Sequence, residues 1–299
     1  MKLLPLQLSW ALVRSTVFLL LCLFGPTGLI ATALQVLLPW TNYVPLRMFI
    51  ADSMHLLFSL LLLYGAARFL EREKLHNFGL SFPPGSIAEF CRGAALGAAM
   101  VTIVTASLFA LGCYRVISVQ NTNDFLALIP ALLVAAFLEE LIFRGYIFHT
   151  LEKASTTKIA LVLSSLMFGA VHMLNFKGDE SWACKLLSCT ALGLDAGLLF
   201  GCAFLVTRRL WLATGIHVCW NLFEGPFYGT PISGLTLGKP FLLSLSSGPE
   251  WLTGGPFGPE ASLIEVAICL LLALWLYRLA TDRQAAGPKK HMEQSAHNV

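Results

Sequence analysis

The sequence contains few charged residues. Lys, Arg, Asp and Glu make up 12% of its 299 residues, whereas about 25% is usual for a soluble domain. Hydrophobic residues make up 57%. This composition excludes an ordinary soluble globular domain. The formal net charge of +3 reflects how basic residues are distributed between the loops, as described below, so we predict no nucleic-acid partner.

Paired cysteines are also missing. None of the eight Cys residues forms a C-x-x-C pair, and most lie in hydrophobic runs, where a thiol behaves as a small apolar side chain. We therefore predict no disulfide framework. Internal repeats and low-complexity tracts are absent too. One domain should cover residues 1–281, and the polar tail over 282–299 should be disordered and cytoplasmic.

Hydrophobic runs, in contrast, are abundant. A helix needs about 20 mainly apolar residues to cross the hydrocarbon of a bilayer. Eight segments approach or reach this length, near residues 16–38, 48–67, 93–112, 125–143, 159–175, 186–206, 210–224 and 261–279. The seventh is the weakest, and we expect it to be short, tilted or embedded against its neighbours. The sequence thus predicts an all-α, polytopic transmembrane bundle of about eight membrane segments.

The basic residues indicate how this bundle is oriented. If the N-terminus is cytoplasmic, fifteen of the twenty Lys and Arg residues fall on the cytoplasmic side, as the excess in short loops requires. Both termini should then be cytoplasmic. The longest connection, 226–260, should be non-cytoplasmic. It is rich in Gly, Pro and Ser, and two interpretations stay open: a functional or flexible loop, and an ordered cap over the helix ends.

The fourth hydrophobic segment ends in charged residues. Glu140 and Arg144 are four apart, so they share a helical face and can form a charge-assisted pair. Glu139 points about 100° away and is left free. A poorly solvated carboxylate of this kind is suited to take a proton from water. The alternative is a structural ion pair at the membrane interface, with the Arg144 side chain reaching into the headgroups.

Two further segments carry polar residues at i, i+4 spacing. Phe168 precedes His172 by four residues, and His217 precedes Asn221 by four. An imidazole inside a span can orient a water, stabilise an oxyanion or bind a metal, and an amide can stabilise an oxyanion. Taken alone, a histidine in an apolar helix is more often a hydrogen-bond partner between helices.

In combination, these residues resemble a known family. E-E-x-x-x-R at 139–144, F-x-x-x-H at 168–172 and H-x-x-x-N at 217–221 are similar to the three ordered motifs of the CAAX protease and bacteriocin-processing (CPBP, or Abi) family of intramembrane proteases. The resemblance covers a motif core at 125–225. It implies a helical bundle with a cavity open toward the cytosol, in a bacterial cytoplasmic (inner) membrane.

The resemblance also implies roles for individual residues. Glu139 would be the general base that activates a water, and Glu140 and Arg144 would support it. His172, His217 and Asn221 would position water or stabilise the oxyanion, whereas Phe168 would serve packing. We therefore expect an intramembrane endopeptidase that hydrolyses a peptide bond of a membrane-associated protein or peptide.

Other interpretations remain open. Glu139, His172 and His217 would suit Zn²⁺ if they converge, but no H-E-x-x-H helix is present, and we favour chemistry that needs no cofactor. The chain could also be a non-catalytic membrane scaffold or immunity protein. A proton-coupled transporter is the third possibility, because intramembrane acids and histidines also mark ion pathways.

Depth and the remaining polar residues raise two more points. Counted from the cytoplasmic helix ends, Glu139 and His217 lie about 6 to 10 Å deep but His172 about 20 Å, so one helix must tilt or begin elsewhere. Asp52 and His55 should lie at the membrane interface. Glu265, early in the eighth segment, has the same interpretation. Asp195, near the middle of the sixth segment, could line the cavity or form a structural hydrogen bond to a neighbouring helix.

Overall fold

The chain folds as a bundle of long helices. The computed structural model describes residues 4–26, 29–30, 43–176, 178 and 180–296. The main helices are α1 (Leu4–Phe24), α3 (Val44–Gly65), α4 (Ser86–Ala110), α6 (Ile129–Glu140), α7 (His149–Ala154), α8 (Thr157–Val171), α9 (Trp182–Leu192), α10 (Leu198–Thr207), α11 (Trp211–Leu222) and α13 (Leu263–Ala296). Short helices are α5 (Asp124–Ala127) and α12 (Glu250–Thr253).

Wider π-helical turns join several of these helices into continuous spans. Leu141–Phe148 connects α6 to α7, Gly193–Gly197 connects α9 to α10, and Ala66–Glu71 extends α3. Among the described residues, seven helical spans are long and apolar enough to cross a membrane. They are Pro5–Phe24, Val44–Glu71, Ser86–Ala110, Asp124–Ala154, Thr157–Asn175, Trp182–Thr207 and Leu263–Ala285. The predicted polytopic helical bundle is thus confirmed.

The seventh predicted segment is α11, and it is short. Nine of its twelve residues are buried, because neighbouring helices surround it. The closest packing is with α4, where a Cβ atom on Gly93 or Gly97 would overlap the backbone of α11 at Leu212 or Ile216. Small residues allow this approach of two backbones, as is common between membrane helices. The segment is therefore embedded in the bundle, one of the outcomes that its length predicted.

Several boundaries differ from the prediction. The first helix ends at Phe24, before Gly25 and Pro26, because proline lacks the amide hydrogen that a continuing helix needs. The sequence predicts this span at 16–38, of which 27–28 and 31–38 lie outside the described residues. The fourth span runs to Ala154 instead of ending at 143. α13 continues to Ala296, through most of the segment predicted as a disordered tail.

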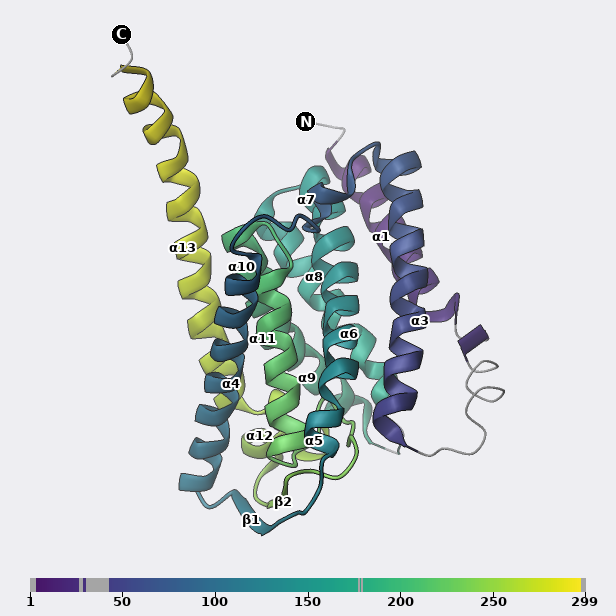
Figure 1. Cartoon of the computed structure of the whole chain (residues 1–299), viewed down its shortest axis with the longest axis vertical. Helices are drawn as coiled ribbons and strands as arrows, with labels where there is room; N and C mark the ends of the chain where they lie inside the picture. The colour runs from purple at the N-terminus through teal and green to yellow at the C-terminus, as the bar shows by residue number, and fades with distance from the viewer. Residues whose placement is uncertain (1–3, 27–28, 31–42, 177, 179, 297–299) are drawn as a thin grey trace.

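Both ends of the chain lie at the same end of the bundle, as the charge bias predicted (Figure 1). The opposite end is covered by the 226–260 connection, which is ordered. Its strand β2 (Leu242–Ser246) pairs antiparallel with β1 (Tyr114–Val119), with Tyr114 opposite Ser246. The hydroxyl of Tyr114 also donates to the carbonyl oxygen of Tyr228 at 2.7 Å. The segment forms a cap over the helix ends at this face.

Ion pairs fasten the helices at the end that holds the termini. Glu71 accepts from Arg14 at 2.6 Å and from Lys153 at 3.2 Å, and Lys153 also donates to Glu73 at 2.5 Å. Glu73 lies just beyond the second span. Partial burial acts to raise its pKa, but hydrogen bonds from Lys153 and Asn77 outweigh that effect and lower the pKa to about 2.

All eight cysteines are free, so the prediction of no disulfide framework is confirmed.

Candidate active site

Glu140 and Arg144 form the ion pair that their spacing predicted. Both side chains are almost fully buried, and Nη1 of Arg144 donates to Oε1 of Glu140 at 3.1 Å. Nη2 donates to the carbonyl oxygen of Gly197 at 2.9 Å. The guanidinium also lies over the rings of Phe168 and Phe200, 4.7 and 5.2 Å from their centroids. The pair is therefore deep in the protein and not at the membrane interface.

This buried pair fixes the ring of His217. Nδ1 of His217 lies 3.0 Å from the same Glu140 oxygen, and the ring stacks on Phe200 with centroids 4.6 Å apart. Because an ionised carboxylate only accepts, Nδ1 carries the hydrogen. Nε2 is thereby turned toward Glu139, 3.8 Å from its Oε2 atom.

His172 is fixed in the same way from another helix. It directly follows α8, and its Nδ1 atom lies 2.8 Å from the carbonyl oxygen of Phe168. A carbonyl accepts only, so Nδ1 is again the donor. Nε2 then faces Glu139 Oε2 at 4.0 Å. The ring of Phe168 packs against Phe143 and Arg144, which is the packing role expected of it.

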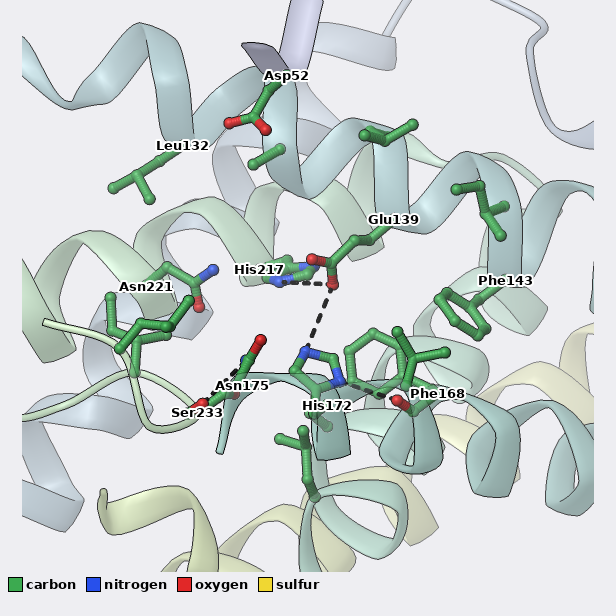
Figure 2. Close-up of a pocket in the computed structure, with 18 of the residues that line it drawn as sticks. Asp52, Leu132, Glu139, Phe143, Phe168, His172, Asn175, His217, Asn221 and Ser233 are labelled. Atoms are coloured by element: carbon green, nitrogen blue, oxygen red, sulfur yellow. Dashed lines mark hydrogen bonds and ion pairs between the residues drawn. The ribbon is translucent and has the colours of Figure 1, made fainter. Parts of the chain in front are cut away.

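Glu139 is free of Arg144 and points between the two histidines (Figure 2). Its side chain is 34% exposed, but the Oε2 atom is buried and has no hydrogen-bond partner among the described residues. An unpartnered carboxylate oxygen is costly away from water, so a water or a proton is needed there. Glu139 therefore has a carboxylate oxygen that is free to accept a hydrogen from a water.

These side chains share one cavity, of about 320 Å³. Glu139, His172, His217 and Asn221 all line it, whereas Glu140 and Arg144 are not among its lining residues. The sequence-predicted residues thus separate into four that face the cavity and two that lie behind it. Figure 2 shows the side chains of Glu139 and the two histidines meeting at the centre, with Asn221 beside His217.

Sequence reasoning missed other residues of the cavity. Asn175, one turn after His172, lines it and donates through Nδ2 to the carbonyl oxygen of Ser233 at 2.9 Å. Ser233 in turn donates to Glu260 through its amide and its hydroxyl, both at 2.5 Å. Asn175 could have been found from its spacing to His172. Ser233 and Glu260 could not, because nothing local links the 226–260 segment to the motifs.

Asp52 and His55 were also misplaced by the sequence analysis. We expected both at the membrane interface, but both line the cavity from α3. Asp195 and Glu265, in contrast, are fully buried outside the cavity lining. Glu260, which precedes the last span, is buried as well, and this burial raises its pKa against the opposing effect of the Ser233 hydrogen bonds.

The three active-site helices place their residues at similar depth. Counting from the ends of α7 and α8, Glu139 (154 − 139 = 15 residues) and His172 (172 − 157 = 15 residues) each lie about 22 Å deep. For His217 the depth is counted along α4 and then α11. Gly93 lies seven residues into α4 and packs against Leu212, and His217 lies five residues past Leu212, so its depth is about 18 Å. The conflict in depth came from ending the fourth span too early, at 143.

The oxygen of Glu139 and the Nε2 atoms of His172 and His217 are the groups in this site that could bind a metal ion. Zinc–nitrogen and zinc–oxygen bonds of about 2.0 to 2.2 Å place tetrahedral ligands roughly 3.3 Å apart. Oε2 of Glu139 is 3.8 and 4.0 Å from the two Nε2 atoms. Within the described part of the chain, no group of three or more His, Cys, Asp or Glu side chains is arranged to hold a metal ion. Chemically the donors suit zinc, but their spacing is too wide by about half an ångström.

Comparison with known proteins adds two matches. Residues 121–223 match the family described as type II CAAX prenyl endopeptidase Rce1-like, and this range contains all three motifs. A protein of Bacillus subtilis (strain 168), YdiL, described as a candidate membrane peptidase, is 28% identical over 146 residues. That alignment covers 46% of this chain and 52% of the relative, so the chain matches about half the length of this curated protein. No solved structure matches.

The matches and the geometry point the same way. The matched range contains α6, α8 and α11, the helices that present Glu139, His172 and His217 to one cavity, and the ordered motifs lie within it. Together with the helical bundle around them, these findings support a member of the CPBP family.

Proposed function

We propose that the chain is an intramembrane endopeptidase that hydrolyses a peptide bond of a membrane-associated protein or peptide, using a water activated by Glu139. One observation carries the proposal: the unpartnered Oε2 atom of Glu139 faces Nε2 of both His172 and His217 in a cavity deep in the bundle. We also propose a bacterial cytoplasmic membrane as its location; the Bacillus relative, described as a membrane peptidase, supports a membrane location.

The first step is the activation of water. With Nδ1 of His172 donating to Phe168, Nε2 of the neutral ring accepts. A single water molecule can therefore donate one of its hydrogens to Nε2 of His172 and its second hydrogen to Glu139. Two such bonds of about 2.8 Å at the tetrahedral angle separate the acceptors by roughly 4.5 Å, which is about half an ångström more than the 4.0 Å found. Glu139 takes one proton as the water oxygen attacks the carbonyl carbon.

The second step needs stabilisation of negative charge on the former carbonyl oxygen. Asn221 lines the cavity one helical turn after His217, and its amide can donate to that oxyanion without changing its own protonation state. Glu139 then returns the proton to the leaving nitrogen as the carbon–nitrogen bond breaks, so the water is divided between the two products. Glu140 and Arg144 act as positioning residues, because they orient His217 from behind.

The decisive test is Glu139→Gln, which preserves shape and removes the base. We expect loss of cleavage with unchanged expression and melting temperature. Glu250→Gln is the matched control, because Glu250 is exposed and lies outside the cavity. Comparing the membrane proteomes of cells with each variant should reveal uncut proteins that accumulate only with Glu139→Gln. A Glu139→Gln protein that retains the biological function would overturn the proposal and favour a scaffold.

A zinc-dependent version has one observation in its favour. Both histidines donate from Nδ1 to a protein acceptor and turn Nε2 toward the same carboxylate oxygen, as metal-binding histidines commonly do. A bound zinc ion would supply a Lewis acid held by Glu139, His172 and His217. We favour the metal-free reaction because of the wide spacing. Elemental analysis of purified active protein, with activity measured after chelation, separates the two.

A further inference from the structure

The cavity contains a second carboxylate that the proposed chemistry does not use. Met48, Asp52 and His55 lie at i, i+4 and i+7 on α3 and all line the cavity, so one face of this helix is turned toward Glu139. Figure 2 shows the Asp52 carboxylate on the opposite side of Glu139 from His172. Asp52 is only partly buried, so a ligand in the cavity can reach it.

The cavity has a surplus of acidic groups. Among the described residues that line it, Asp52, Glu139 and Glu260 are acidic, and none is Lys or Arg. Glu260 is held by two hydrogen bonds from Ser233. Among the ion pairs of the described residues, none includes Asp52. Asp52 therefore faces the cavity without a cation from the described protein.

Two carboxylates in this position disfavour each other's charge. Asp52 and Glu139 are close enough to interact electrostatically, and repulsion between like charges is stronger in a membrane-embedded cavity than in water. The Arg144 guanidinium lies behind the cavity and is already paired with Glu140. A cation placed between Asp52 and Glu139 would offset this repulsion.

We propose that Asp52 is a specificity-determining residue that binds a cationic group of the substrate peptide, a Lys or Arg side chain or a free amino group, next to the bond that is cut. The inference rests on the proposed function. The ligand chemistry is an ammonium or guanidinium ion. A peptide is favoured over a lipid headgroup, because the cation site shares a cavity with the Glu139 and histidine groups that would hydrolyse a peptide bond.

Binding can be measured without catalysis. The Glu139→Gln protein is placed in phosphatidylcholine nanodiscs and titrated with fluorescent hydrophobic peptides that differ only in one position, Lys or norleucine. We expect the Lys peptides to bind about tenfold more tightly, as is typical of a charge-assisted hydrogen bond. Adding Asp52→Asn should abolish the difference, whereas adding Glu250→Gln, which removes an exposed carboxylate outside the cavity, should leave it intact.

The results that would contradict the role of Asp52 can be told apart from those that would contradict the proposed function. Equal affinity for Lys and norleucine peptides, or a Lys preference that survives Asp52→Asn, overturns the inference. If phosphatidylethanolamine nanodiscs abolish the preference, the site binds a lipid headgroup, and the peptide assignment is wrong. Cleavage of the same peptides by the wild-type protein tests the proposed function separately. Cleavage that ignores the cation refutes only the role of Asp52, whereas Lys binding without any cleavage refutes only the peptidase.

Discussion

The buried pair of Glu140 and Arg144 allows a quantitative test of how the site is held together. Replacing Arg144 with Met removes the hydrogen bonds to Glu140 and to the Gly197 carbonyl and leaves the Glu140 carboxylate, fully buried, without a cation. Breaking one side of a buried ion pair costs about 3 to 5 kcal/mol. We expect Arg144→Met to destabilise the fold by that amount.

The double variant Glu140→Leu/Arg144→Met separates this cost from lost packing. It removes both charges and keeps hydrophobic side chains of similar size beside Phe168 and Phe200, so no buried charge is left unpaired. We expect the double variant to be more stable than Arg144→Met alone, by about 2 kcal/mol or more. The orientation of His217 should nevertheless be lost, because its Nδ1 atom no longer has Glu140 as acceptor.

Thermal unfolding in detergent, followed by tryptophan fluorescence, measures three variants in one double-mutant cycle: Arg144→Met, Glu140→Leu and the double variant. Peptidase activity measured on the same preparations should be low in all three, including the double variant that regains stability. Additive destabilisation, with the double variant the least stable, would refute the reasoning that the pair acts as a unit. Full activity in the double variant would refute the positioning role of Glu140.

Three further predictions concern stability. Gly97→Ala should cost about 1 to 3 kcal/mol because its Cβ would overlap the Ile216 carbonyl, whereas the control Gly65→Ala, in open space on α3, should gain up to about 1 kcal/mol in thermal unfolding. The pKa of Glu73 is lowered from its ordinary value near 4.5 to about 2, so the stability that ionised Glu73 gives the fold should be lost as the pH falls from about 4.5 toward 2. Glu73→Gln should flatten that part of the pH–stability curve. Burial raises the pKa of Glu260, so its ionisation should destabilise the fold progressively as pH rises above about 4.5; Glu260→Gln should raise the melting temperature at pH 8 and not at pH 4.

Much of the bundle followed from local sequence. Hydrophobic length identified the spans, and the spacing of Glu140 and Arg144 identified a pair that is present at 3.1 Å. The boundaries were less predictable, because a π-helical turn carries the fourth helix through Arg144 and on to Ala154 without interruption. A charged residue ends a hydrophobic run but does not end a helix when its charge is neutralised inside the bundle.

The rest of the cavity depended on tertiary contacts. Asp52 looked interfacial because it lies early in its span, and only the packing of α3 beside α6 turns it toward Glu139. Ser233 and Glu260 reach the cavity through the fold of the 226–260 connection, where a positive φ at Ser233 allows the chain to turn. No periodicity marks such a segment, so its residues could not be placed from the sequence.

The position of the cavity along the bundle bears on how a substrate reaches it. Its lining comes from the early part of α3 (Met48, Asp52), the end of the fifth span (Leu174, Asn175) and the 226–260 connection. All of these belong to the half of the bundle opposite the two termini, whereas the resemblance implied a cavity open toward the cytosol. If the end with the termini is cytoplasmic, as the distribution of basic residues predicts, these residues lie in the non-cytoplasmic half, whereas Phe200, which also lines the cavity, lies seven residues from the opposite end of α10.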